Sequence, residues 1–268
     1  MKRCRAGALA ASLAACGSVS STAGSDAAVS IDAKVFQDAA PLRSCAPPPL
    51  ITDVEVAEPG YAGTCIHGAW TLEALNGVTV PVAVGQPDNT TDVVPEAIAA
   101  SFNTKHVESR FAVHVSGHGQ QNTATASAFA QLTASLNSLS KTDIGTVDAS
   151  AYTGIRFFAR LASGPSGARL TVGTLYTDPV GGQCIPGGTN KSGCFDNPGA
   201  QLAISGTTWM EYKVAFDTLT QIGFGLPSPT GVNFPKQAIT HIKWDIGIPT
   251  DDTATEAWDL WVDDLTFY

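Results

Sequence analysis

The sequence predicts an all-β protein, an antiparallel β-sandwich of the jelly-roll type, preceded by a signal peptide and a disordered linker. Three observations predict this fold class. Apolar and polar residues alternate with a period of two over many short segments, Gly- or Pro-rich turns separate these segments, and residues 50–268 have an ordinary length for one sandwich domain. Many short strands with turn signals between them are typical of β-sandwiches.

The alternating segments are the expected strands. They are Ser109–Ser116, Gly154–Arg160, Ala168–Tyr176, Trp209–Phe216, Ile239–Ile246 and the terminal segment 257–268. Successive side chains of a strand point to opposite faces, so parity assigns to the core Ile155, Phe157, Met210, Tyr212, Val214, Ile242, Trp244, Leu260 and Val262. Only Ala126–Leu139 has a helix-like pattern, which its serines and threonines weaken.

The chain begins with the features of an export signal. Lys2, Arg3 and Arg5 precede the apolar run Ala6–Ala15, which is too short to span a bilayer. Residues 13–16, Leu-Ala-Ala-Cys, have the form of a bacterial lipobox, so we expect a lipoprotein signal peptide at 1–15 and lipidation of Cys16; an ordinary signal peptide is the alternative. Gly17 stands where Gram-negative lipoproteins of the inner membrane have Asp, and resemblance to that system implies an exported protein of the outer membrane or cell surface.

The next segment, 16–49, is expected to be a flexible linker, because its Ala, Ser and Pro residues cannot bury enough apolar surface to fold. Removal of the signal leaves 12 Lys and Arg against 24 Asp and Glu. A surface this acidic repels nucleic acid and anionic headgroups, which predicts no nucleic-acid partner and membrane contact through the lipid anchor only. We expect a monomer whose partner is neutral or cationic.

Four cysteines are left after the signal and the lipidated residue are set aside. In an exported chain an even number predicts two disulfides, for which three pairings are possible. Proximity favours Cys45 with Cys65 and Cys184 with Cys194. A zinc site is the alternative, but the close Cys or His pairs that it needs are missing from the sequence.

Four segments in order resemble one known family. They are Leu50–Glu55, Tyr152–Arg160, Trp209–Phe216 and Trp258–Phe267. Together they resemble the galactose-binding-like jelly-roll carbohydrate-binding modules, in a branch of predicted bacterial surface lipoproteins of unestablished function. The resemblance covers nearly all of the domain 50–268 and implies noncatalytic carbohydrate recognition. Two segments depart from the pattern: Val56–Pro59 replaces further acidic residues or glycine, and the Trp-Gly pair expected after Gly119 is missing.

Two adjacent carboxylates, Asp263 and Asp264, interrupt the apolar last segment, and alternation directs one of them to the buried side. The resemblance implies that the first and last strands are neighbours, which would bring Asp53 and Glu55 beside this pair. Several carboxylates in one place need a cation, and the family commonly holds structural Ca²⁺ there. The alternative is that Asp53 and Asp263 are solvated and that a β-bulge accommodates Asp264.

Sugar recognition needs flat aromatic faces beside a few polar groups. By parity the outward positions are Arg156, Phe158, Trp209, Glu211, Lys213, His241, Lys243, Asp245, Asp259 and Trp261. From these we predict a glycan-binding set consisting of Arg156, Phe158, Trp209, Glu211, Lys213, Asp245 and Trp261. A merely solvated charged face is the alternative.

Catalytic motifs are weak in this sequence. A G-x-S-x-G elbow is missing, and His114 and His118 would share a metal only if the chain turned back at Gly117. Glu211 and Asp245 form a glycosidase pair only at a separation that the sequence does not give. The sequence therefore predicts a noncatalytic glycan-binding module, with a structural or adhesion envelope lipoprotein that binds no small molecule as the alternative.

Overall fold

The structure is a computed structural model that describes residues 50–52, 70–75, 78–79, 90–92, 96–97, 111–119, 129–137, 144–164, 167–188, 192–228, 234–247 and 256–268. The predicted signal peptide, the linker, Cys16, Cys45, Cys65, Asp53 and Glu55 lie outside these residues. Within them, no helix is both long enough and apolar enough to cross a membrane.

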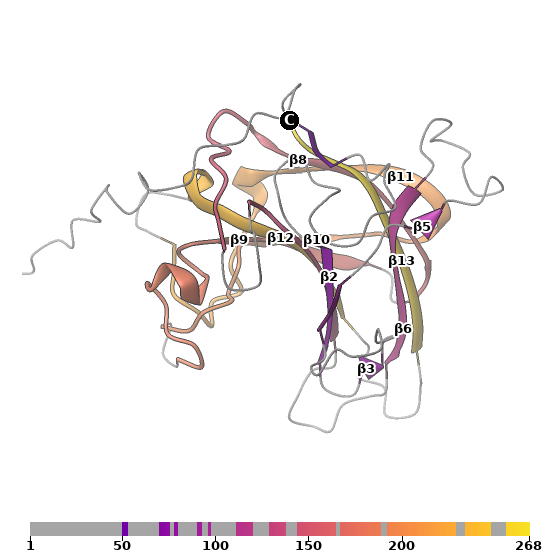
Figure 1. The fold of residues 1–268 in the computed structure, drawn as a ribbon, viewed down its shortest axis with the longest axis horizontal. Helices are drawn as coiled ribbons and strands as arrows, with labels where there is room; N and C mark the ends of the chain where they lie inside the picture. The colour runs from indigo at the N-terminus through magenta and orange to yellow at the C-terminus, as the bar shows by residue number, and fades with distance from the viewer. Residues whose placement is uncertain are drawn as a thin grey trace, which may run out of the picture. The chain divides into compact units, whose positions relative to one another are not determined.

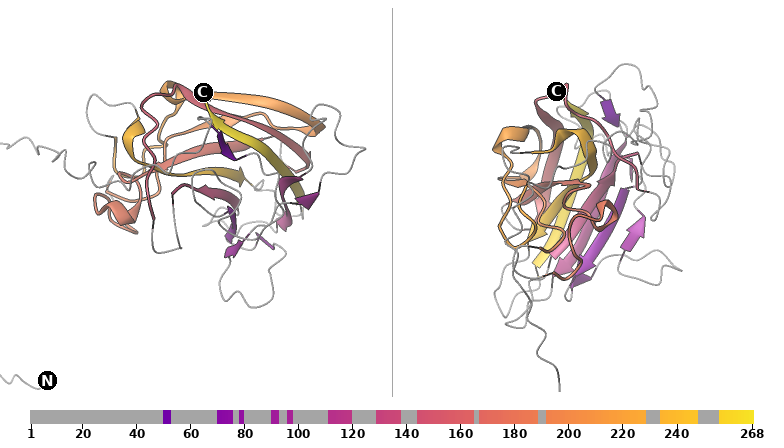
Figure 2. Two further views of the ribbon diagram at one scale, coloured as in Figure 1. Left: turned by 45° about the horizontal axis from the view of Figure 1, so that its top comes forward. Right: turned by 90° about the vertical axis from the view of Figure 1, so that its left-hand side faces the viewer.

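Two antiparallel sheets make up the fold (Figures 1 and 2). The first sheet has the order β11 (Gly206–Ala215), β8 (Gly154–Ser163), β13 (Glu256–Phe267), β6 (Phe111–Gly119) and β3 (Val78–Thr79), with β1 (Leu50–Thr52) paired to β13 and β5 (Glu96–Ala97) paired to β6. The second sheet has the order β10 (Gly199–Leu202), β9 (Ala168–Thr174), β12 (Ile239–Gly247), β7 (Phe129–Ser135), β2 (Trp70–Leu75) and β4 (Thr90–Asp92).

From β6 to β9 the chain alternates between the two sheets, and it alternates again from β10 to β13. This repeated crossing is the connectivity of a jelly roll. The predicted fold class, an all-β antiparallel sandwich of the jelly-roll type, is therefore confirmed. The family resemblance also implied that the first and last strands are neighbours, and β1 does pair with β13, with Thr52 opposite Leu265.

The core fills the space between the sheets. Phe157 of the first sheet meets Trp244 of the second edge-on, with ring centroids 5.2 Å apart, and Trp70 stacks on Trp244 at 5.7 Å. Most residues assigned to the core by parity belong to this cluster, including Ile155, Val214, Ile242, Leu260 and Val262. These contacts bury the apolar face of each sheet, which is the main term that stabilises a sandwich.

Two expectations about local structure were wrong. The helix-like stretch 126–139 contains strand β7, because Ala130, Leu132, Ala134 and Leu136 are all fully buried and repeat with a period of two. Met210 was assigned to the core but is 48% exposed. It lies on β11, the edge strand of its sheet, where the register to β8 shifts between Gly206 and Met210.

Candidate functional site

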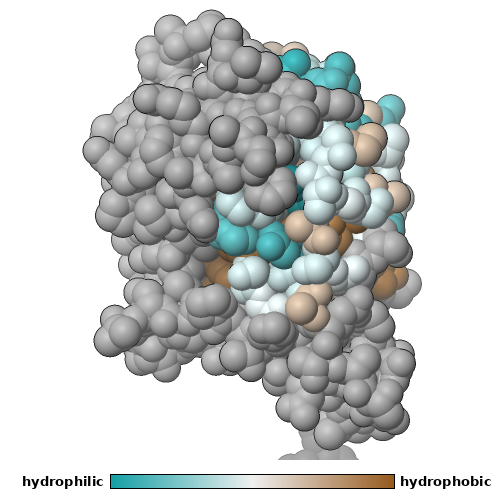
Figure 3. All heavy atoms as spheres, turned by 90° about the vertical axis from the view of Figure 1, so that its right-hand side faces the viewer, coloured by the Kyte–Doolittle hydropathy of each residue, from teal (hydrophilic) through white to brown (hydrophobic). Residues whose placement is uncertain are grey.

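The outer face of the first sheet carries most of the predicted glycan-binding residues. Strands β11, β8 and β13 are neighbours, and register places Glu211 opposite Phe158 and Lys213 opposite Arg156. Arg160 lies opposite Trp261 in the next pair of strands. Six of the seven residues therefore share one face: Arg156, Phe158, Trp209, Glu211, Lys213 and Trp261. Figure 3 views the side of the molecule where Figure 1 shows β11, β13 and β6, and hydrophilic and hydrophobic side chains adjoin there.

Four side chains form a stack across this face, which we call the aromatic–arginine ladder: Trp209 (β11), Arg160 (β8), Trp261 (β13) and His114 (β6). The Arg160 guanidinium carbon lies 5.4 Å from the Trp209 ring centroid and 4.5 Å from that of Trp261. The His114 ring stacks on Trp261 at 3.9 Å with an interplanar angle of 10°. Each of these contacts joins side chains of neighbouring strands, so the ladder links four strands through cation–π and stacking contacts.

The ladder is closed to ligand in this structure. Trp209 is fully buried, and Arg160 and Trp261 are nearly so. Parity placed both tryptophans on the outer face correctly, but neither offers the exposed ring that stacking on a sugar requires. The binding role predicted for them is untested and stays a prediction.

Electrostatics at the ladder follow from burial and one carboxylate. Burial lowers the pKa of Arg160, and the charge of Asp259 opposes that change. Burial raises the pKa of Asp259, but the adjacent His114, Trp261 and Arg160 together hold it below its usual value. The His114 Nε2 lies 3.2 Å from Asp259 Oδ1. Asp259 is therefore an ionised counter-charge for the buried guanidinium.

Beside the ladder lies an exposed group that we call the charged strip: Arg156, Glu211 and Lys213, with side-chain exposures of 42, 39 and 55%. Glu211 Oε1 is 3.7 Å from Arg156 Nη1 and 3.8 Å from Lys213 Nζ. Arg156 Nε donates to Thr266 Oγ1 at 3.3 Å. The ring of Phe158, half-buried and packed against the ladder, adjoins this strip because it lies directly opposite Glu211.

Asp245 does not belong to this face. It lies on β12 in the second sheet, where Gln131 Nε2 donates to its Oδ1 at 2.8 Å and burial raises its pKa against the effect of Lys243. Parity gives the side of a strand but not the sheet, so the sequence could not separate Asp245 from the other six. The outer faces of two stacked sheets point apart, which also excludes Glu211 and Asp245 as a glycosidase pair.

The carboxylate pair of the last strand sits at a β-bulge. Asp263 is fully buried and opposite Phe158, on the outer face. Asp264 has a left-handed φ of 49°, and its backbone N–H donates to Asp263 Oδ1 at 2.8 Å. After the bulge Leu265 and Phe267 return to the core. The bulge weighed as the alternative is therefore present, whereas Asp263, which that alternative left solvated, is buried.

The predicted calcium site is described only in part. Among the described residues, no group of three or more His, Cys, Asp or Glu is placed to hold a metal ion. Two of the four predicted ligands, Asp53 and Glu55, lie outside that part of the chain. The two that are described, a buried carboxylate and its neighbour at the bulge, fit an oxygen-ligated cation in chemical type. Calcium at Asp53, Glu55, Asp263 and Asp264 stays a prediction.

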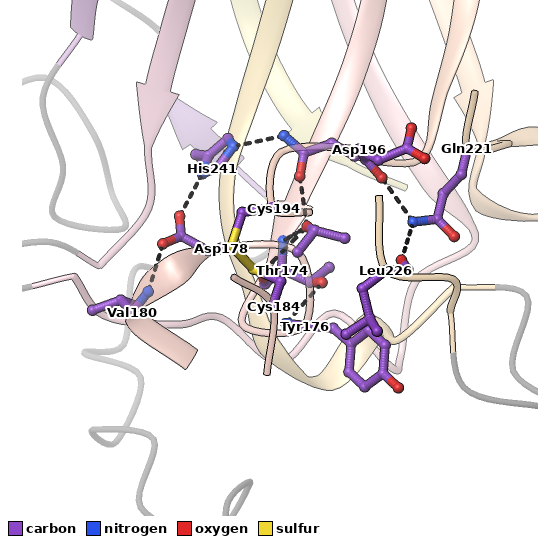
Figure 4. Close-up of a disulfide and its surroundings, with 12 residues drawn as sticks. Thr174, Tyr176, Asp178, Val180, Cys184, Cys194, Asp196, Gln221, Leu226 and His241 are labelled. Atoms are coloured by element: carbon purple, nitrogen blue, oxygen red, sulfur yellow. Dashed lines mark hydrogen bonds and ion pairs between the residues drawn. A yellow bond between two sulfur atoms is a disulfide. The ribbon is translucent and has the colours of Figure 1, made fainter. Parts of the chain in front are cut away.

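Within the described part of the chain, a disulfide joins Cys184 and Cys194, as predicted (Figure 4). Next to it Asp196 is buried, and its carboxylate accepts backbone N–H bonds from Ile222, Gly223 and Gly225 at 2.8 to 3.0 Å. Gln221 Nε2 donates to the carbonyls of Asp196 and Leu226. The disulfide loop and the loop 221–226 are thereby held together as one unit.

This unit and the residues flanking the disulfide loop, including the short 3-10 helix η4 (Pro179–Gly181), expose apolar side chains, which we call the loop patch. Its members are between 49 and 70% exposed and are Val180, Ile185, Phe195, Ile222 and Phe224. Phe195 has a φ of 71°, which is unfavourable for an aromatic residue. Sequence reasoning noted this loop only for its cysteines and turn residues. The apolar residues between the turn formers could have indicated this patch. Parity could likewise have placed Arg160 and His114 on the face that carries the ladder.

His241, expected on an outward face, is buried under the same unit. Its Nδ1 lies 2.9 Å from Thr240 Oγ1 and its Nε2 3.3 Å from Asn197 Nδ2. Burial, and then the charge of Lys243, lower its pKa well below the usual value. A Cβ on Gly173 would overlap the imidazole, at 2.0 Å from Cε1. His241 is a neutral residue buried beneath the loop unit, and Gly173 leaves space for it.

Comparison with known proteins gives likenesses of fold alone. No protein-family model matches the chain, and no curated protein matches its sequence. The structure is similar to a family 11 carbohydrate-binding module of the cellulosomal cellulase Lic26A-Cel5E of Clostridium thermocellum, with 12% identity, 81% of this chain and 92% of that chain covered, and a TM-score of 0.46.

Two further solved structures are similar at the same low level. A family 30 carbohydrate-binding module of the cellulosomal cellulase Cel9D-Cel44B of Clostridium thermocellum is 10% identical over 81% of this chain and 96% of that chain, with a TM-score of 0.45. An exo-β-agarase is 10% identical over 82% of this chain and 25% of its own, with a TM-score of 0.41. At such values neither residues nor ligands carry over to this chain.

Proposed function

We propose that this protein is a noncatalytic module that binds a glycan on the outer face of its first sheet. The observation that carries the proposal is the charged strip beside Phe158: exposed hydrogen-bonding groups from two adjacent strands surround an aromatic ring on one face. Hydroxyl groups of a sugar need such donors and acceptors, and its apolar ring face needs the aromatic surface.

In this proposal each residue has a role. The Phe158 ring supplies apolar surface, while Arg156, Glu211 and Lys213 supply hydrogen bonds. The ladder fixes the strands beneath, because Arg160 lies between two tryptophan rings and cannot move without leaving both. A binding face held by its own scaffold loses less entropy on association than a mobile one.

A glycan array with the purified domain, followed by calorimetry on the best ligand, tests the proposal. Phe158→Ala should weaken binding by about tenfold, which corresponds to about 1.4 kcal/mol. Met210→Ala is the matched control, because this exposed apolar residue lies on the same sheet but points to the opposite side. Equal loss in both variants, or no glycan bound by the unaltered domain, would argue against this face.

A second candidate function is adhesion through the loop patch, the alternative in which the protein binds no small molecule. Five large apolar side chains exposed on and beside the disulfide-closed unit are the observation that favours it, since exposed apolar patches mark protein contacts. Ile222→Asp with Phe224→Asp should abolish binding to envelope proteins if this surface acts, and should leave glycan binding unchanged.

We also propose that the module is held at the outer membrane or cell surface by lipid on Cys16, as a monomer. The lipobox and the basic, apolar leader support this proposal. Cys16→Ser should move the protein from the membrane fraction to the soluble fraction. An unaltered protein found entirely in the soluble fraction, with its N-terminus at another residue, would contradict it.

A further inference from the structure

We infer that the glycan recognised by the charged strip is anionic, with a carboxylate or a sulfate group that lies between Arg156 and Lys213. This inference rests on the proposed function and narrows its ligand class. It starts from a conflict in the strand pairing, since Lys213 and Arg156 are direct register partners on one exposed face. Like charges directly opposite each other destabilise a sheet, with Cβ atoms about 5 Å apart.

The carboxylate of Glu211 lies near both cations but is hydrogen-bonded to neither. Glu211 Oε1 is 3.7 Å from the guanidinium and 3.8 Å from the ammonium, beyond hydrogen-bonding distance. Two positive charges and one negative charge leave the strip with a net positive charge. Among the described residues, the hydrogen bond of the Arg156 side chain is made by Nε to Thr266, so its terminal nitrogens point to Glu211 without bonding it.

Two other acidic residues of this face, Asp259 and Asp263, are set apart from the strip by their own contacts or burial. Asp259 lies beside His114 and is the counter-charge of Arg160, and Asp263 is fully buried. The net charge of the whole chain is −9, which favours neutral or cationic partners at long range. At physiological ionic strength that field is screened beyond about 8 Å. The affinity for a charged group in contact with the strip therefore depends on Arg156 and Lys213.

The chemistry that fits is a planar or tetrahedral anion on a pyranose. The Arg156 guanidinium presents a fork of N–H donors that matches carboxylate or sulfate oxygens, and Lys213 adds a point charge beside it. Phe158, directly opposite Glu211, lies close enough to contact the ring that bears the anion. A uronic acid or a sulfated sugar supplies both parts in one residue.

Polygalacturonate and its methyl ester form the first test, because they differ in charge and share a backbone. We expect the unaltered protein to bind polygalacturonate about tenfold more tightly than the ester at physiological ionic strength, where the field of the negatively charged chain is screened, and the difference to shrink at molar salt, which also screens the strip itself. Carrageenan and its desulfated form are the second arm. A preference for the sulfated polymer alone would identify sulfate as the anion and still support the inference.

Charge variants test whether the bound group is negatively charged. Glu211→Gln removes the competing carboxylate and should raise affinity for the anionic polymer severalfold, whereas Arg156→Gln and Lys213→Gln should each lower it by about tenfold. Lys243→Gln, which makes the same change in net charge on the second sheet, should have no effect. Equal binding of charged and uncharged polymers would overturn the inference and leave the proposed function in place. Failure to bind any glycan would overturn both.

Discussion

Asp264 is a single residue whose backbone decides how the last strand ends. Its left-handed φ of 49° creates the bulge, and the bulge moves Leu265 and Phe267 onto the core side. Without the extra residue, the alternation set by Leu260 and Val262 would place Leu265 outside. Aspartate tolerates this conformation better than most residues do, which explains an acidic residue at this point of an apolar strand.

The bulge gives a prediction about substitutions of Asp264. Val is β-branched and disfavours the left-handed region, so Asp264→Val should lower the free energy of unfolding by about 1–2 kcal/mol, whereas Asp264→Gly should leave it equal or higher. Urea unfolding in the presence of a chelator measures both without any contribution from a bound ion. Lys213→Val, at an exposed strand position, is the control and should have little effect. Equal stabilities of the Val and Gly variants would refute a strained bulge.

A second residue-scale prediction concerns pH. His241 is neutral in the folded protein because burial lowers its pKa, and an unfolded histidine titrates near 6.5. Below that pH the unfolded state binds a proton that the folded state does not, so stability should fall as pH falls, by up to about 1.4 kcal/mol per pH unit. Asp178 Oδ2, 3.7 Å from Nδ1, and Lys243 are the charged groups nearby.

His241→Gln should remove this slope between pH 6.5 and 5. Free energies of unfolding measured at several pH values test it, and the NMR titration of the His241 ring should show no protonation above pH 5 in the folded protein. The same slope in both proteins would mean that another group titrates there.

At the scale of elements, the Cys184–Cys194 disulfide and Asp196 stabilise the loop unit by different means. The disulfide restricts the unfolded chain. In the chain-entropy model, loss of a disulfide that closes a loop of this size lowers the free energy of unfolding by about 3 kcal/mol. Replacing both cysteines by Ala should lower the free energy of unfolding by about that amount under oxidising conditions. A reductant should then have no further effect on this loop. An unchanged stability of the double variant would show that Asp196 alone holds it.

Six of the seven described strands with seven or more residues could be predicted from the sequence, whereas β7 and the short strands β2, β3, β4, β5 and β10 were missed. Parity placed Phe157 and Trp244 in the core because each side of a strand meets one environment. Strand β7 was predicted to be helix-like because the small residues of β7, such as Ala130 and Ala134, favour helices unless a partner sheet covers them. The bulge was visible as a change of parity between Val262 and Leu265, which the two acidic residues partly concealed.

At the scale of the whole molecule, alternation predicted the side of the strand on which each proposed site residue lies, but not how exposed its side chain is. Alternation put Trp209 and Trp261 on the outer face, but an arginine from the strand between them brings the rings into one buried stack. Which sheet a strand joins is decided by pairing between distant segments. Asp245 was therefore grouped with residues of the other sheet.

The pairing of the first and last strands leads to a prediction about calcium. Thr52 lies opposite Leu265, and each is adjacent in sequence to a predicted ligand, Asp53 and Asp264. If Asp53, Glu55, Asp263 and Asp264 bind Ca²⁺, the ion binds the folded state only, and stability should rise by RT ln(1 + [L]/Kd), about 2.7 kcal/mol at a hundredfold excess over Kd. A chelator should therefore lower the Tm, as differential scanning calorimetry would show.

The ligand set makes this calcium prediction specific. Asp263→Asn removes charge from the buried carboxylate and should abolish the calcium-dependent rise in Tm, whereas Asp148→Asn, an exposed carboxylate on a loop far along the chain, should leave it intact. Ionic strength must be constant, because screening of a net negative chain by any added salt also raises the Tm slightly. Identical melting curves with and without chelator, together with metal analysis that finds no calcium, would mean that the buried Asp263 is satisfied by the protein itself and that the aspartate pair serves the bulge alone.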